Sequence, residues 1–161
     1  MTGYLQFALV TFTSLLFIVD PVAVIPTYLV ITQEQSAQAR RRTALRSCIA
    51  AGILMTVFGI AGTWIFKVFG ITLPAFRIAG GLILWLVAMD MLRGQRSTQE
   101  GTEEIVEGQE KEDVALTPLA MPMLAGPGAI STVMVLAGQS HTIAGNVAVY
   151  GSVWLTAIIC W

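Results

Sequence analysis

The chain has 161 residues, of which 55% are hydrophobic and only 12% are charged, and its formal net charge is −1. An ordinary soluble domain carries about 25% charged residues, so these side chains cannot supply the polar shell of a soluble fold. The mean hydropathy of +0.74 also indicates a membrane protein. Since no excess of basic residues is present, nucleic-acid binding is not expected.

Five apolar segments follow one another along the chain, and each predicts a helix in the membrane. They are too long and too continuously apolar for the alternating strands of a membrane barrel. The fifth is shorter than the roughly 20 residues that a span needs, so we expect a fragment or a missing C-terminal part. The segments cover residues 5–31, 47–68, 74–92, 116–138 and 146–161.

Lys and Arg are concentrated in two of the connecting loops. Cytoplasmic loops carry an excess of basic residues, so the sequence predicts that both loops face the cytoplasm. The second loop, 93–115, also holds seven acidic residues and is expected to be a solvated linker. The basic residues of these loops are Arg40, Arg41, Arg42, Arg46, Arg93, Arg96 and Lys111.

The first apolar segment contains Asp20-Pro21 near its centre. Proline inside a helix removes a hydrogen bond and clashes with the preceding turn, so the helix should stop near Val19. Asp20 is then a suitable N-cap and Pro21 a suitable first residue for a second half-helix. Two interpretations of Asp20 stay open: its carboxylate only caps the half-helix, or it also faces a solute.

The fourth segment is interrupted in the same way by Gly126-Pro127-Gly128. Gly126 can end one half-helix and Pro127 can begin the next. When Pro21 is set on Pro127, Ala23 falls on Ala129 and Val24 on Ile130. Paired broken helices in an inverted repeat indicate the binding site of a transporter, because freed backbone groups there line a cavity.

Other residues are given structural interpretations. Small residues recur on the second and third segments and are typical of close helix packing in lipid. Cys48 and Cys160 lie in apolar runs and are read as small hydrophobes. His141, the only histidine, lies in a short polar gap and is read as a loop residue. The small residues are Gly52, Gly59, Gly62, Gly80 and Gly81.

Three stretches of sequence resemble the MarC family of integral membrane proteins, which is grouped with small neutral amino-acid transporters. They are DPVAVIPTYLVIT in the first segment, FRIAGGLILWLVAMDML in the third and PLAMPMLAGPGAISTVMVL in the fourth. The resemblance covers the whole chain. It implies six membrane helices in two inverted halves, a bacterial inner-membrane location and transport of small neutral amino acids. The sequence departs from the family at Ala23, where glycine is usual, and in having no sixth helix.

The predicted fold is therefore an all-α membrane protein, a polytopic bundle of two inverted three-helix repeats, each with a broken first helix. Residues 1–92 form the first repeat, 93–115 the acidic cytoplasmic linker, and 116–161 an incomplete second repeat. No span carries a nucleophile–base pair, and no Cys/His spacing predicts a metal site or a cofactor. The chain is accordingly not expected to be an enzyme.

The leading functional prediction is an inner-membrane secondary transporter of a small neutral amino acid or a similar solute. The alternative is a non-transporting membrane module that binds a partner protein or assists assembly. Partners consistent with transport are the lipid bilayer, the solute, a coupling ion (proton or sodium) and further copies of the chain. The predicted substrate-binding residues are Asp20, Pro21, Gly126, Pro127, Gly128, Ala129, Ser131 and Thr132.

The predicted chemistry of this site follows from the charges of an amino acid. The N–H groups of Gly128, Ala129 and Ile130 and the helix dipole would hold the carboxylate. Asp20 would face the ammonium group, and the hydroxyls of Ser131 and Thr132 would add hydrogen bonds.

Overall fold

The structure, a computed structural model, describes residues 2–72, 74–76, 78–79, 81–82, 85, 89, 115–140 and 142–161. Every element within these ranges is a helix. The predicted third span, the linker and His141 lie wholly or mostly outside them. The helices are α1 (Thr2–Val19), α2 (Pro21–Ile31), α3 (Ala37–Val68), the π-helix η1 (Ala115–Leu124), α6 (Pro127–Gln139) and α7 (Ile143–Cys160).

Within the described residues, three stretches of helix are long and apolar enough to cross a membrane. They are Gly3–Ile31, Ala37–Gly62 and Ile143–Cys160. Many large apolar side chains point outward, among them Phe17 and Ile143, which are 81% and 85% exposed. A surface this apolar is suited to lipid, because a water-soluble monomer rarely exposes so much of it.

The second span begins earlier than the sequence predicts. Its helix, α3, starts at Ala37, whereas the expected segment started at Ser47. Ser36 caps it, with its hydroxyl accepting the Ala39 N–H at 3.3 Å. The intervening residues are mainly alanine, glutamine and arginine, which are strong helix formers, so polarity there marks the edge of the membrane rather than the end of the helix.

The fourth segment is not one long helix. Its first half, η1, is a π-helix, and Ala125 N–H donates to the carbonyl of Ala120, five residues back, at 2.9 Å. Pro118 and Pro122 lie within η1. A proline ring clashes with the carbonyl four residues earlier, and a wider turn moves that carbonyl away, which is our physical reason for the π geometry.

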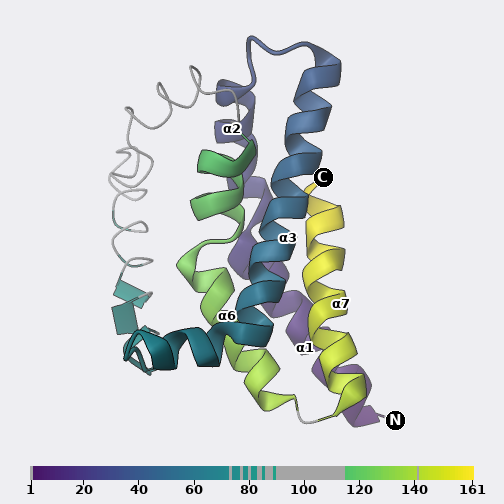
Figure 1. The fold of residues 1–161 in the computed structure, drawn as a ribbon. Coiled ribbons are helices and arrows are strands. Elements are labelled where there is room, and N and C mark those ends of the chain that lie inside the picture. Colours follow the sequence, from purple (N-terminus) through teal and green to yellow (C-terminus); the bar gives the residue numbers. More distant parts are fainter. Residues whose placement is uncertain are drawn as a thin grey trace.

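One large apolar core lies among the described helices. In Figure 1, α1 and α7 run side by side from the end where the N-terminus lies, and α6 and α3 complete the group. The buried side chains of the core come from α1, α3, η1 and the residue that follows it, α6 and α7. Its largest fully buried members are Leu15, Met55, Val133, Val149 and Val153.

Glycines allow the helices of this core to approach closely. A Cβ added to Gly59 would lie 2.8 Å from Val133 and 3.0 Å from Tyr150, and one added to Gly52 would lie 3.1 Å from Trp154. These contacts confirm the structural interpretation of the glycines on α3. Gly62 belongs with them, because its Cβ would meet Met134.

Candidate functional site

The first break lies at Asp20, between α1 and α2. Asp20 has φ 45° and ψ 71°, and it is the one non-glycine residue with positive φ in the described part of the chain. Its side chain accepts the Ala23 N–H at 3.3 Å, and its carbonyl accepts the same N–H at 3.1 Å. Aspartate tolerates this left-handed conformation because its short polar side chain bonds locally. The carboxylate therefore caps α2, and it is exposed.

The second break lies between η1 and α6. Gly126 has φ −71° and ψ 171°, an extended conformation, and no side chain caps α6. Its carbonyl accepts the Ile130 N–H at 3.0 Å. The prediction that Ile130 offers a free N–H is therefore wrong, because the residue after the third helical position already makes the first intrahelical bond. By the geometry of a helix start, Gly128 and Ala129 keep N–H groups without an intrahelical partner.

The hydroxyls predicted near this turn differ in their availability. Ser131 Oγ donates to the carbonyl of Gly128 at 3.0 Å, so it is engaged within α6. Thr132 is half-buried. A solute hydrogen bond from Ser131 would have to replace an existing one, which makes Ser131 a weaker candidate ligand than the sequence indicates.

The two breaks are joined through the core. Val19, which ends α1, belongs to the same buried cluster as Ala125 and Ala129, which flank the start of α6. Gly128 is buried and Pro127 half-buried, whereas Asp20 is exposed. The structure thus places residues that flank the two breaks in one buried cluster but does not enclose the Asp20 carboxylate with the first turn of α6.

A cavity of about 310 Å³ lies among α2, α3, η1 and α7, and it reaches Pro21 at the first break. Its volume is at the lower end of the range for ligand pockets, so it suits a small molecule. Pro21 is the one predicted site residue that lines it; the polar or polarizable lining residues are Tyr28, Ser47, Cys48, Cys160 and Trp161. Apolar side chains such as Val24, Leu119 and Leu124 complete it.

Sequence reasoning missed these lining residues. Both cysteines are free thiols that border one cavity, although Cys48 is on α3 and Cys160 is on α7. No local pattern could have signalled this meeting of distant residues. Within the described ranges, no group of three or more His, Cys, Asp or Glu side chains could hold a metal ion.

Comparisons with known proteins agree with this architecture. The family model described as "MarC family integral membrane protein" matches residues 5–161. A UPF0056 membrane protein of Aquifex aeolicus is 39% identical over 147 residues, which are 91% of this chain and 69% of that protein. One of Methanocaldococcus jannaschii is 37% identical over 139 residues, 86% of this chain and 68% of that protein.

The Escherichia coli UPF0056 membrane protein YhcE is 34% identical over 151 residues, 93% of this chain and 70% of that protein. The chain therefore spans about 70% of the length of these relatives. No solved structure matches it. Because the family model covers nearly the whole chain and includes both breaks, this protein is an integral membrane protein of the MarC family.

Proposed function

We propose that this chain is a multi-pass inner-membrane protein that moves a small neutral amino acid, or a similar small solute, across the bilayer. The observation that carries the proposal is the pair of interrupted helices, at Asp20–Pro21 and at Gly126–Pro127, whose flanking residues share one core cluster. Interrupted helices leave backbone groups free in the interior, and transporters place solutes and coupling ions against such groups.

The second break supplies the backbone N–H groups that would bind an anion. The second residue of α6, Gly128, is buried, and the first turn of α6 presents N–H groups at the positive end of the helix dipole. In the proposed mechanism these groups receive the solute carboxylate, as helix N-termini receive other anions. Gly128 has no side chain, so the carboxylate can approach the backbone there.

The first break supplies the opposite charge. Asp20 is the one acidic residue within the described membrane helices, since Glu34 lies in the α2–α3 turn. In this proposal the Asp20 carboxylate leaves the Ala23 N–H and turns toward the ammonium group of the solute. A small neutral side chain suits the site because the described membrane helices offer no second acidic residue to pair with a positively charged one.

The two breaks also support an inverted repeat. Each places proline at the first position of a half-helix and alanine two residues later, Pro21 with Ala23 and Pro127 with Ala129. With three spans in each half, the second half would be inverted relative to the first. A coupling ion, either a proton or sodium, would bind near the same two breaks. The chain would carry solute and perform no covalent chemistry.

Uptake of labelled glycine and alanine into proteoliposomes tests the proposal. The purified chain should carry at least one of them faster than empty liposomes do, and an excess of the unlabelled solute should compete. Leucine and glutamate serve as controls for size and charge. A chain that is folded and inserted but gives no flux of any of the four would instead support the non-transporting membrane module.

Orientation is tested separately. The arginine-bearing start of α3 is expected on the cytoplasmic side, so a cysteine at Gln38 should resist an impermeant thiol reagent added to intact cells. A cysteine at Gln99 should behave in the same way, because both loops lie on one side in this topology. Labelling of only one of the two would contradict it.

A further inference from the structure

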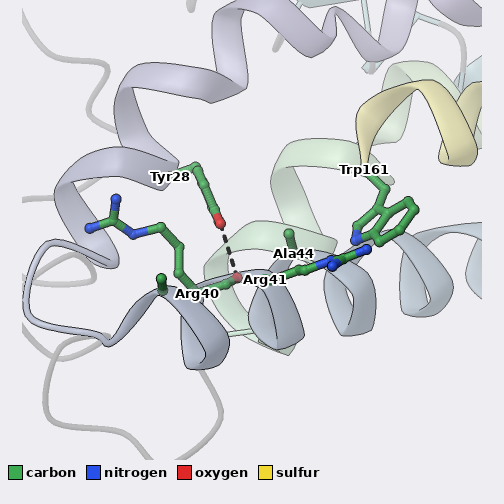
Figure 2. Close-up of a pocket in the computed structure, with 6 residues that line it drawn as sticks. Tyr28, Arg40, Arg41, Ala44 and Trp161 are labelled. Atoms are coloured by element: carbon green, nitrogen blue, oxygen red, sulfur yellow. Dashed lines mark hydrogen bonds between the residues drawn. The ribbon is translucent and has the colours of Figure 1, made fainter.

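We propose that a second pocket, formed where α2, α3 and α7 meet, binds the phosphate group of an anionic phospholipid. This inference does not depend on the proposed transport function. The pocket has a volume of about 430 Å³ and is lined by Tyr28, Ala37, Arg40, Arg41, Ala44 and Trp161. Figure 2 shows Arg41 extended toward the Trp161 ring and Arg40 on the opposite side of the pocket.

Arg40 forms part of the wall of the pocket. Its Nη2 donates to the carbonyl of Thr32, the C-cap of α2, at 3.1 Å. Its own carbonyl accepts the Tyr28 hydroxyl at 2.9 Å (Figure 2). These two bonds hold the end of α2 against the start of α3. One of its donors stays unused, because Nε is buried without a hydrogen-bond partner.

Arg41 supplies the charge that a ligand can reach. Its guanidinium carbon lies 5.0 Å from the centre of the Trp161 ring, over the ring, and the side chain is exposed. Stacking occupies the face of a guanidinium group and leaves the N–H groups at its edge free. An edge of this kind binds two phosphate oxygens at once, which makes arginine the preferred residue for phosphate recognition.

The charges around the pocket favour an anion. The N-terminus of α3 contributes about half a positive charge. Arg40 and Arg41, in the first turns of the same helix, add two full positive charges. Glu34 is the one described acidic residue in the α2–α3 turn, and it does not line the pocket.

The position of the pocket identifies its occupant as a lipid. It lies beside the end of one stretch that is apolar enough to span a membrane, Gly3–Ile31, and next to the start of another, Ala37–Gly62. Tyr and Trp are enriched at the depth of the lipid headgroups, and basic pockets between membrane helices bind anionic headgroups. A phosphate diester at this depth comes from phosphatidylglycerol or a related lipid.

The test compares short-chain phosphatidylglycerol with short-chain phosphatidylcholine as additives to the detergent-purified chain, and follows the thermal unfolding midpoint. Phosphatidylglycerol should raise the midpoint with a saturable dependence, and phosphatidylcholine should not. Arg41→Gln should weaken the apparent affinity about tenfold or more, the effect of losing a charge-assisted hydrogen bond. Arg42→Gln is the matched control, since Arg42 is the exposed neighbour on α3 and does not line the pocket.

A second variant covers the case in which Arg41→Gln does not fold. Arg41→Lys keeps the charge and loses the planar fork, so it should retain part of the midpoint shift at a weaker affinity. Equal loss in the Arg41 and Arg42 variants would overturn the proposal by showing a non-specific charge effect. An equal shift with inorganic phosphate would overturn the assignment to a lipid.

The acidic stretch 100–113 is the competing occupant within the chain. If the phosphatidylglycerol shift appears only after its acidic residues are replaced by glutamine, the arginines are held by that stretch and the lipid proposal is overturned. If the shift is the same with and without those replacements, the lipid proposal is supported.

Discussion

A new helix begins after each of the two breaks, but different chemical groups complete the two helix starts. At the first, Asp20 takes a left-handed backbone conformation and its carboxylate caps α2 from an exposed position. At the second, Gly126 stays extended, no side chain caps α6, and the first turn of α6 is buried. A polar side chain therefore completes the first break, whereas the second leaves its backbone N–H groups open. The proposed transport function therefore assigns the anion to the second break and the cation to the first.

The largest expected effect is that of Asp20→Asn on transport. Asparagine tolerates the left-handed conformation and can still cap α2, so insertion and the unfolding midpoint should stay near those of the unmodified chain. Flux should fall at least tenfold, because the charged partner of the ammonium group is lost. Glycine and alanine uptake into proteoliposomes measures it. An unchanged rate would leave Asp20 with a capping role alone.

Asp20→Val addresses the backbone of the first break. Valine is β-branched and lacks the local hydrogen bond by which aspartate tolerates a left-handed conformation, so it bears a cost of about 1–2 kcal/mol, and loss of the cap costs about 1 kcal/mol more. We therefore expect the free energy of unfolding to fall by roughly 2–3 kcal/mol, measured by titration with a denaturing detergent. Asp20→Gly is the matched control and should cost only a few tenths of a kcal/mol, because glycine adopts this conformation freely.

Gly128→Val addresses the first turn of α6. Gly128 is buried, so an added side chain must displace its neighbours, and overpacking of this kind typically costs about 1–3 kcal/mol. Flux should be blocked as well, because the side chain crowds the N–H groups proposed to hold the carboxylate. Gly151→Val on α7 is a control, since a Cβ at Gly151 has no atom within 4 Å. Equal effects of the two changes on unfolding and on flux would contradict this role for Gly128.

The smallest expected effect comes from giving the second break the cap that it lacks. Gly126→Ser keeps an extended conformation that any residue can adopt and adds a hydroxyl that can accept the N–H of the third helical residue, Ala129. The free energy of unfolding should rise by only a few tenths of a kcal/mol. If the N–H groups are the anion site, flux should nevertheless decrease, because the new hydroxyl competes with the solute. A rise in flux would argue against that site.

Local features of the sequence were sufficient to predict the N-cap of α2 and the first residues of α2 and α6. Proline and a capping residue act within a few positions, so Asp20, Pro21 and Pro127 could be assigned their places from sequence alone. The start of α3 was missed, because hydropathy reports where lipid ends and not where helical hydrogen bonding ends.

The remaining features depend on contacts between distant residues. The π-helix geometry of η1 and the cavity between Cys48 and Cys160 arise only when several helices pack together. The same holds for the stacking of Arg41 on Trp161. Whether the Asp20 carboxylate meets the first turn of α6 is likewise a question of tertiary structure, and the sequence could offer only the residue types.

The length of α3 has a consequence for how the protein sits in bilayers of different thickness. Its 32 residues extend about 48 Å at 1.5 Å per residue, well beyond a hydrocarbon layer of roughly 30 Å. The extra length corresponds to the polar turns of α3 before Ser47. The hydrogen bonds of Arg40 hold these turns against α2. Hydrophobic mismatch is usually absorbed by tilting a helix or deforming the bilayer. Here a thicker membrane can cover one more turn of α3, and long arginine side chains can extend along it to reach the headgroups.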